Sequence, residues 1–390
     1  MAERVVDSAE SELAPCTLQE LLLYFLRLGS VGFGGPIALV GYMQRDLVEE
    51  RRWISAKDYG EGLALAQLAP GPLAAQLAIY LGWLRAGTLG ATLVAIAFIA
   101  PSFLMVLALS ALYLRYGGLP WMQGAFYGVG AAVIAIIARS AYKLARATLG
   151  KDRLLGVIFA VSALITAWTE SEIVWVFVIS GVVALLAKRR PTWLGRSAAA
   201  LAPWPWLFTG LHGPAQEQLS TIFWYFAEAG TFVFGSGLAI VPFMHGGVVG
   251  DYQWLSERQF LDAVAVAMIT PGPVVITVGF IGYLVAGPLG AVVASLGVFL
   301  PCYLLVIVPA KYFRRSVSDP RVKAFVDGVT AAATGAIAGA AFVLGRRAIT
   351  DVPTAAIALV ALVALVRLKR APEPLLILAA GLAGLALQGP

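Results

Sequence analysis

Long uninterrupted stretches of apolar residues dominate the chain, and polar positions are confined to the short segments between them. The stretch from Leu89 to Leu114 is typical, and similar ones surround Val129, Leu155, Val174, Val264, Val293 and Ala333. Each approaches or exceeds the about 20 residues that cross a hydrocarbon core as a helix. The alternation of polar and apolar positions that marks membrane β-strands is absent. The pattern therefore predicts an all-α polytopic membrane protein.

Composition strengthens this prediction. Hydrophobic residues make up 60% of the chain and charged residues 13%, against roughly a quarter charged in ordinary soluble domains. The net charge of +6 is explained by an excess of Lys and Arg in cytoplasmic loops. We therefore expect the lipid bilayer, and no nucleic acid, as the chain's surroundings.

One pattern of apolar segments occurs twice. The sequence FLRLGSVGFGGPIALVGYM from Phe25 returns as FAEAGTFVFGSGLAIVPFM from Phe226, and QLAPGPLAAQ from Gln67 returns as MITPGPVVIT from Met268. An offset of 201 makes 15 of the 48 positions from Phe25 to Pro72 identical, and after a one-residue gap the offset becomes 200. We expect two homologous repeats, residues 1–190 and 218–390, joined by a Pro- and Trp-rich linker, residues 191–217.

The positions of Lys and Arg predict how the repeats are inserted. In the first copy they gather around residues 45–57, 139–153 and 188–196, and in the second around 311–323 and 367–370. Counting every apolar stretch as a crossing would give twelve helices in parallel halves. The basic clusters instead alternate between the copies, which favours an inverted-topology repeat with about ten crossings. In that count the Pro-Gly-Pro segments are re-entrant, because they enter and leave on one side.

Two Pro-Gly-Pro triplets interrupt the apolar sequence, Pro70-Gly71-Pro72 and Pro271-Gly272-Pro273. Proline lacks the amide hydrogen and clashes with the preceding turn, so a helix must break there. A break at membrane depth is tolerated where backbone groups face protein or a wet cavity. The restarting helix exposes N–H groups that attract anions. We expect the two breaks to line a central anion pathway, although a kink that only shapes packing is the alternative.

Glycine-rich segments predict a second opening of the backbone in each half. Gly34 and Gly35 form it in the first copy, and Gly235 and Gly237 in the second. Glycine lets a ligand approach the backbone closely. Close packing between helices explains the same pattern equally well.

Several polar side chains lie inside these apolar segments. Glu61 and Asp262 occupy equivalent positions nine residues before the triplets, and we consider them for proton coupling, with an interfacial carboxylate at a helix start as the alternative. Arg27 would balance the charge of an anion. Its counterpart Glu228 is a candidate ion-pair partner for it, and the pair has a purely structural interpretation as well. Gln67 and Gln76 would donate amide hydrogens; Met268 and Thr277 replace them in the second copy.

No other chemistry is indicated by the sequence. Cys16 and Cys302 lack metal-ligand spacing, and His212 and His245 have no neighbouring ligands in the sequence, so we expect solvated loop histidines. No HExxH, GxSxG or Walker-type motif occurs. We therefore predict no catalytic residues, no metal and no cofactor.

The motifs resemble those of the chromate transporter family. FGGP followed by GYM, WISAKDY, ALAQLAPGPLAAQLAIYLGW and IAPSF in the first copy, and WLSERQFLDAVAVAMITPGPV and FLPCY in the second, are similar to its two-domain members over nearly the whole chain. The resemblance departs at Glu228, where the family usually has a basic residue, and at Ser236, where it usually has glycine.

The resemblance implies a multi-pass transporter of the cytoplasmic membrane that exports chromate and confers chromate resistance. The partners implied are chromate, with sulfate and protons as further candidates, and a homodimer is one option for assembly. A carrier of sulfate or another oxyanion is the alternative within this class. A membrane enzyme acting on lipid phosphates and a non-transporting scaffold are the alternatives outside it.

Overall fold

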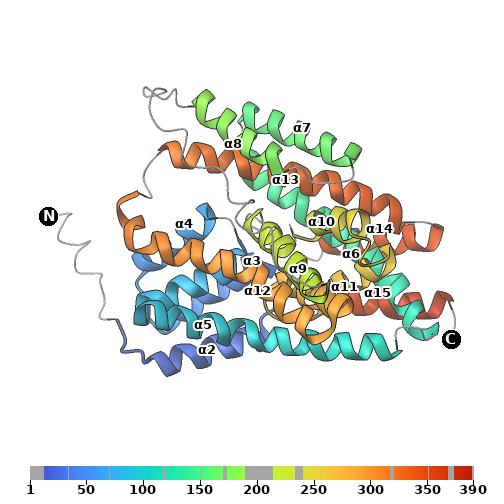
Figure 1. The fold of residues 1–390 in the computed structure, drawn as a ribbon, viewed down its shortest axis with the longest axis horizontal. Coiled ribbons are helices and arrows are strands. Elements are labelled where there is room, and N and C mark those ends of the chain that lie inside the picture. The colour runs from blue at the N-terminus through green and yellow to red at the C-terminus, as the bar shows by residue number, and fades with distance from the viewer. Residues whose placement is uncertain are drawn as a thin grey trace.

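The computed structural model describes residues 13–33, 35–69, 71–116, 120–150, 152–169, 174–188, 214–232, 240–316, 320–349, 351–367 and 373–388. Within these ranges the chain is helical, with turns and bends between the helices and no strand. The predicted all-α class is therefore confirmed (Figure 1). Gly34, Pro70, Gly235 and Gly237 lie outside the described residues, as do His212 and most of the predicted linker.

The helices fall into two matching series. The first consists of α2 (Leu18–Val31), α3 (Gly35–Met43), η2 (Gln44–Glu50), α4 (Ala56–Leu68), α5 (Leu73–Tyr116), α6 (Pro120–Leu149), α7 (Arg153–Thr169) and α8 (Val174–Lys188). The second consists of α9 (Pro214–Phe232), α10 (Ile240–His245), η5 (Gly246–Asp251), α11 (Glu257–Ile269), η6 (Val274–Ile276), α12 (Thr277–Ser316), α13 (Pro320–Ala348), α14 (Val352–Arg367) and α15 (Glu373–Gln388). The start of α9 precedes the expected repeat boundary, residue 218, by four residues.

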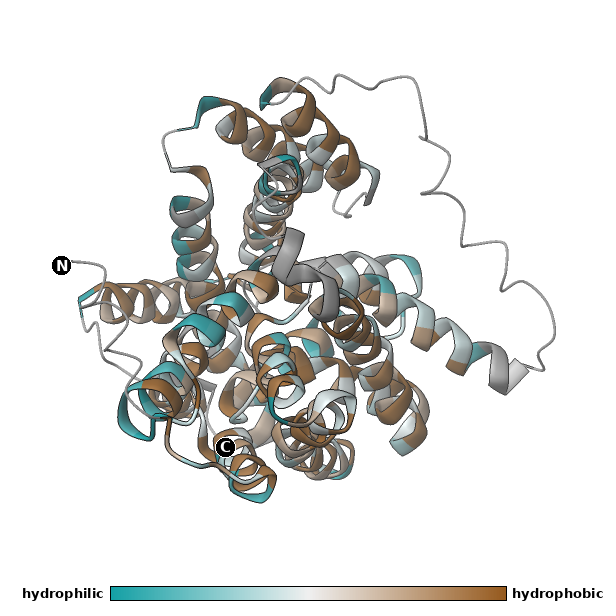
Figure 2. Cartoon of the chain, turned by 90° about the vertical axis from the view of Figure 1, so that its left-hand side faces the viewer, coloured by the Kyte–Doolittle hydropathy of each residue, from teal (hydrophilic) through white to brown (hydrophobic). Residues whose placement is uncertain are grey.

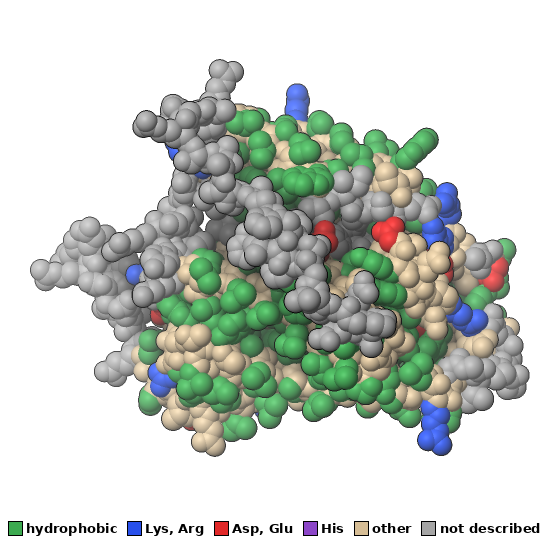
Figure 3. All heavy atoms as spheres, viewed as in Figure 1, with side chains coloured by type: hydrophobic (Ala, Val, Ile, Leu, Met, Phe, Trp, Pro, Cys, Tyr) green, Lys and Arg blue, Asp and Glu red, His purple; other side chains and the backbone are tan. Residues whose placement is uncertain are grey.

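Four helices of the described chain are long and apolar enough to span a membrane, namely α5, α6, α12 and α13. Four shorter apolar helices, α7, α8, α14 and α15, accompany them. Figure 2 shows the apolar character of these helices, and Figure 3 shows a broad apolar surface with Lys and Arg at its margins. An outward-facing apolar surface of this kind suits lipid as the solvent, so the chain is a multi-pass membrane protein.

A sharp bend divides α5 and α12 at equivalent places. The backbone leaves the helical conformation at Ala86 and Gly87 in α5 and at Ala286 and Gly287 in α12. Gly87 has φ of 57°, a value that glycine adopts without strain. A Cβ on Gly82 would lie 2.6 Å from the Gly90 carbonyl oxygen, although in a straight helix eight residues rise about 12 Å. Each helix is therefore a short arm folded back against a long arm.

The short arm of α5 also folds back on α4. Gly62 and Tyr80 lie nine residues on either side of Gly71, and a Cβ on Gly62 would approach Tyr80 Cε1 within 2.7 Å. We call α4, residues 69–72 and residues 73–86 the first hairpin. α11 packs on α12 in the second half, and α11, residues 270–273, η6 and residues 277–286 form the second hairpin. α4 and α11, of 13 residues each, are about 20 Å long, too short to cross a bilayer alone.

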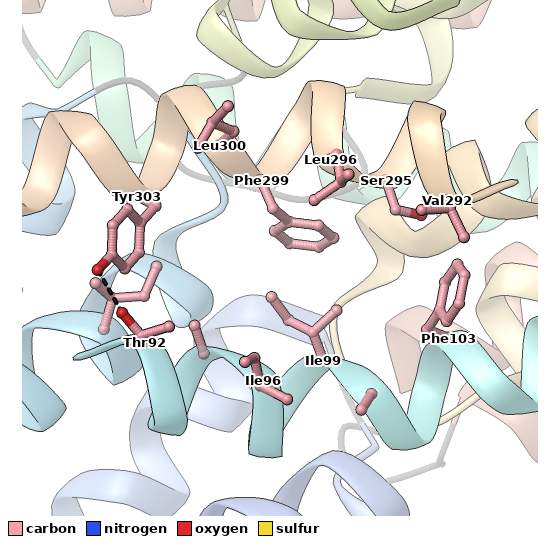
Figure 4. A pocket seen from close by; sticks show the side chains of 13 residues that line it. Thr92, Ile96, Ile99, Phe103, Val292, Ser295, Leu296, Phe299, Leu300 and Tyr303 are labelled. Carbon is pink, nitrogen blue, oxygen red and sulfur yellow. Dashed lines mark hydrogen bonds between the residues drawn. The ribbon is translucent and has the colours of Figure 1, made fainter. Parts of the chain in front are cut away.

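The long arms of α5 and α12 lie side by side and run in opposite directions. The hydroxyl groups of Thr92 and Tyr303 are 2.6 Å apart, while Phe103 lies beside Val292 (Figure 4). Advancing along α5 therefore means moving backwards along α12. A groove of about 440 Å³ between them is lined mainly by apolar side chains.

The outer helices of each half pack on the other half. α7 and α8 cover α13, while α14 and α15 cover α6. Ser162 of α7 donates a hydrogen bond of 2.7 Å to the Ala332 carbonyl of α13, and a Cβ on Gly128 of α6 would lie 2.9 Å from the Gly384 nitrogen of α15. Through this exchange of outer helices, each repeat packs extensively on the other.

Candidate substrate site at the chain breaks

Each hairpin begins with a capped helix. The Ser55 hydroxyl accepts a hydrogen bond of 3.0 Å from the Asp58 nitrogen at the start of α4. The Ser256 hydroxyl accepts one of 3.3 Å from the Gln259 nitrogen at the start of α11. Serine at the N-cap satisfies an amide that has no carbonyl partner in the first turn. Both hairpins therefore start at a point fixed by sequence, 13 residues before their breaks.

The first break follows Leu68, the last residue of α4. Gly71 has φ of 136°, in the region that favours glycine, and α5 starts two residues later. Gln76 is fully buried, and its Nε2 would lie 2.6 Å from a Cβ on Gly71. Gly71 and Gln76, two of the residues proposed from sequence for substrate binding, thus lie side by side, whereas Gln67 is exposed at the end of α4.

The second break follows Ile269, the last residue of α11. Gly272 has φ of 96°, and its N–H donates a hydrogen bond of 2.8 Å to the Gly32 carbonyl. Pro271 and Pro273 have no N–H. In this conformation the amide that we expected to contact an anion is therefore already used by the first half.

The Gly-rich segment of the first half meets this second break. α2 ends at Val31, Gly32 follows it in an extended conformation, and α3 begins at Gly35. Ser102 in the long arm of α5 donates to the Pro271 carbonyl at 2.7 Å and lies 3.2 Å from the Gly29 carbonyl. Two interruptions that are almost 240 residues apart in sequence thus share one buried junction.

A mirrored contact occurs at the first break. Cys302 follows Pro301 in α12 just as Ser102 follows Pro101 in α5. Its Sγ would lie 3.2 Å from a Cβ on Gly71, and the side chain is fully buried. Each break therefore packs on the long arm of the other half. The sequence did not reveal that Ser102 and Cys302 lie next to the triplets, because only the fold brings them there.

The two carboxylates occupy unequal surroundings. Asp262 is buried, and its Oδ2 accepts a hydrogen bond of 2.7 Å from the Tyr113 hydroxyl. Arg258, one turn earlier in α11, donates to the Gln123 carbonyl at 3.1 Å. Glu61 is only partly buried in α4. The alternative of an interfacial carboxylate at a helix start suits Glu61 better than Asp262.

Arg27 and Glu228 do not pair with each other. Both side chains are exposed, Arg27 on α2 and Glu228 on α9, and no ion pair joins them among the described residues. The predicted ion pair across the halves is therefore not formed in this conformation. Arg27 still lies close in sequence to the junction, five residues before Gly32.

His245 is not a solvated loop residue, contrary to the expectation from sequence. It is buried, and its Nε2 lies 2.8 Å from Glu257 Oε2. Arg347 of α13 forms an ion pair with the same carboxylate. The three residues are distant in sequence, so spacing gave no signal of the cluster. In the described ranges no group of three or more His, Cys, Asp or Glu side chains is arranged to hold a metal ion.

Two grooves open elsewhere on the described surface. One is the groove between the long arms of α5 and α12, and the other, of about 880 Å³, lies among α5, α6, α11 and α15. Apolar side chains line both. The described triplet residues line neither of these grooves.

Comparison with known proteins gives consistent matches. The family model described as Chromate transporter matches residues 19–185 and again residues 220–385. The chain is 57% identical over 375 residues to the chromate transport protein of Cupriavidus metallidurans, covering 95% of this chain and 93% of that protein. It is 57% identical over 377 residues to the probable chromate transport protein of Synechococcus elongatus, covering 95% of each. It is 33% identical over 395 residues to the chromate transport protein of Pseudomonas aeruginosa, covering 97% and 94%. No solved structure matches the chain.

Proposed function

Because the chain belongs to the chromate transporter family, we propose that it exports chromate, a doubly charged tetrahedral oxyanion, across the cytoplasmic membrane. The observation that carries the proposal is the junction at the centre of the fold, where the Gly272 amide and Ser102 join the second Pro-Gly-Pro break to the end of α2. Helix breaks at membrane depth, one from each repeat, are the usual place for the substrate of a secondary transporter.

The two halves are inserted in opposite orientations in this proposal. The antiparallel long arms of α5 and α12 support it, because equivalent helices that cross a bilayer in opposite directions belong to inverted repeats. The loops before the hairpins support it as well: Arg45, Arg51 and Arg52 precede α4, whereas no Lys or Arg occurs between His245 and Arg258. A basic loop on the cytoplasmic side and a neutral counterpart outside follow the positive-inside rule.

The anion is held between the hairpin tips and the Gly-rich segments. Gly71 and Gly272 provide backbone amides, and Gln76 provides a side-chain amide beside Gly71. Arg27 supplies the positive charge, and Gln67 contributes from the exposed end of α4. Gly34, Gly35, Pro70, Gly235 and Gly237 complete the same breaks in the sequence. The tips must separate from their packed arrangement for the anion to enter, which is the movement that exchanges access between the two sides.

Proton coupling, where it occurs, uses Asp262 rather than Glu61. Asp262 is the carboxylate that is buried and hydrogen-bonded to a hydroxyl group across the halves. A carboxylate withdrawn from water in an apolar span is costly to keep charged. Glu61 at the equivalent place is more accessible and serves the anion path electrostatically.

The direction follows from the charge of the substrate. Moving a dianion outward from a negative interior releases about 4.6 kcal/mol per 100 mV, twice the about 2.3 kcal/mol for one charge. This free energy sustains roughly a thousandfold concentration gradient. Export therefore requires no ATP hydrolysis.

The test is chromate flux in proteoliposomes with an imposed potassium diffusion potential. We expect chromate to move toward the positive side, to reverse when the potential is reversed, and to be absent from protein-free vesicles. Sulfate added in excess measures how far the site discriminates between two dianions of nearly the same shape. Flux that is absent, or that ignores the sign of the potential, would contradict the proposal.

A further inference from the structure

The junction at the second break depends on a single hydroxyl group. Ser102 is fully buried, and its Oγ lies 2.7 Å from the Pro271 carbonyl and 3.2 Å from the Gly29 carbonyl. A hydroxyl group has one hydrogen to donate. Because the contact with the Pro271 carbonyl is the shorter of the two, Ser102 donates mainly to Pro271. Ser102 therefore holds the peptide that carries the Gly272 N–H, from a helix that belongs to the other half.

That peptide is the main donor of the second break. Pro271 and Pro273 lack amide hydrogens, so Gly272 provides the N–H at the tip itself. It donates to the Gly32 carbonyl at 2.8 Å. The carbonyl groups at the end of α2 carry the negative end of its helix dipole, so an anion cannot occupy the junction while they face it. For an anion to bind, Gly272 must exchange the Gly32 carbonyl for the anion.

The mirrored position is built from a weaker group. Cys302 lies against Gly71, and a thiol is a poor hydrogen-bond donor. Among the described residues Cys302 forms no hydrogen bond to another half. The chain thus places a strong donor behind the second break and a soft apolar group behind the first.

We propose that Ser102 is a positioning residue for the anion, resting on the proposed transport function. Its bond to the Pro271 carbonyl keeps the Gly272 N–H pointing into the space between the halves while that N–H changes partner from Gly32 to the anion. Cys302, a thiol, offers a poorer donor at the equivalent place behind Gly71. The two breaks then have different tasks: the second break presents a fixed donor, and the first adapts through the Gln76 side chain.

The experiment compares Ser102→Ala with the matched truncation Cys302→Ala in proteoliposomes under one imposed potential. We expect Ser102→Ala to raise the KM for chromate roughly tenfold or more, since a hydrogen bond to a charged group carries about that factor. The maximal rate should fall less than the affinity. Cys302→Ala should leave the KM within about threefold of wild type, because it removes packing and no donor. A merely structural role for Ser102 would lower the amount of folded protein and the maximal rate with KM unchanged.

Chromate binding gives a second readout that does not require turnover. A ligand that binds the folded state raises the apparent melting temperature, so chromate should stabilise wild type and Cys302→Ala, and stabilise Ser102→Ala only at about tenfold higher concentration. If wild type transports chromate and Ser102→Ala keeps the wild-type KM and stabilisation, the positioning role is wrong and the transport proposal stands. If wild type itself neither binds nor moves chromate, both fall.

Discussion

The first and second hairpins follow the same course, from the π-helix that precedes each one to the bend that follows it, apart from the turn η6 in the second, but they differ in their surroundings. In the second hairpin α11 is buried from Asp262 to Met268, whereas in the first Gly60 and Gln67 are exposed on α4. Side chains tie α11 to three neighbours, through Tyr113, the Gln123 carbonyl and Arg347. The α11 residues that make these contacts are Asp262, Arg258 and Glu257. Their counterparts in α4 are Glu61, Lys57 and Ala56. The second hairpin is thus more deeply buried than the first.

The loops that lead into the two hairpins have the same backbone conformation but differ in the side chain that packs on their tryptophan. Arg52 and Gln253 adopt positive φ, 54° and 51°, at equivalent positions. Trp53 donates to Leu47 and Trp254 to Val248, both at 2.8 Å. The Arg51 guanidinium lies 4.6 Å from the Trp53 ring, while the Tyr252 ring stacks 4.6 Å from that of Trp254. The second half has a neutral ring where the first has a cation over tryptophan, without a change of backbone, and this agrees with our proposal that the two loops face opposite sides of the membrane.

The largest effect is expected at the glycines of the two tips. Gly272→Ala should abolish transport and destabilise the chain more than Gly71→Ala. Both positions have positive φ, which costs a side chain about 1–3 kcal/mol, but a Cβ on Gly272 would also overlap the Ser102 hydroxyl, held by its own hydrogen bonds. At Gly71 the nearest atom is the end of the flexible Gln76 side chain. Thermal unfolding and flux of the two variants measure the difference; equal losses would contradict the contrast between the breaks.

Neutral isosteres of the two carboxylates come next. Asp262→Asn should remove the pH dependence of chromate flux, while Glu61→Gln should retain it, because Asp262 is buried beside the Tyr113 hydroxyl and Glu61 is only partly buried. Tyr113→Phe should change the rate by roughly fivefold, the factor that corresponds to about 1 kcal/mol for one neutral hydrogen bond. Flux measured from pH 5 to 8 tests all three. If the chromate flux of Asp262→Asn depends on pH in the same way as that of wild type, Asp262 has no role in proton coupling.

A moderate effect is expected when the two loops are made alike. Arg51→Tyr copies the second half, so the fold should tolerate it with a loss of about 0.5–1 kcal/mol for the exposed cation–π contact. The matched variant Tyr252→Arg should keep its fold too, yet place a positive charge in a loop that we assign to the outside. Thermal stability and membrane yield of the two variants check this, and a yield lowered by Arg51→Tyr alone would oppose the assignment.

The smallest effect concerns the two aspartates that cap α7 and α14. The Tyr127 hydroxyl, together with Thr354, lowers the pKa of Asp351, and Lys188 is the main cause that lowers the pKa of Asp152. A lowered folded-state pKa stabilises the protein above the unfolded pKa, and this contribution is lost as the pH falls through the folded value. Tyr127→Phe should therefore reduce stability at neutral pH and make no difference in acid, below both values. Melting temperatures between pH 3 and 7 test the prediction; a difference between Tyr127→Phe and wild type that does not shrink toward the acid end would oppose it.

Much of the fold could be predicted because apolar runs, prolines and the internal repeat leave direct signals in sequence. Adding 201 to the residue numbers of α4 gives those of α11, so the two helices begin and end at equivalent residues. Gly87 and Gly287, matched in sequence, lie at the two bends. The site was harder. Gly71 and Gln76 could be proposed from sequence because both belong to the segment around one triplet. The pairing of His245 with Glu257 depends on how α10 and α11 pack, and the contacts of Ser102 and Cys302 with the triplets join helices of different halves. Such contacts follow from how the repeats interlock, which sequence periodicity does not encode.

The most direct measurement concerns the central claim that the same hairpin enters the membrane from opposite sides. Arg52→Cys and Gln253→Cys place single exposed thiols at equivalent turns, while Cys16 and Cys302 are buried and the unsubstituted chain gives the background. In cells treated with a membrane-impermeant maleimide, we predict that the Gln253→Cys protein is labelled from outside, and that the Arg52→Cys protein is labelled only after the membrane is opened. Labelling of both from the same side would contradict the inverted arrangement and, with it, the meeting of two opposed breaks around the anion.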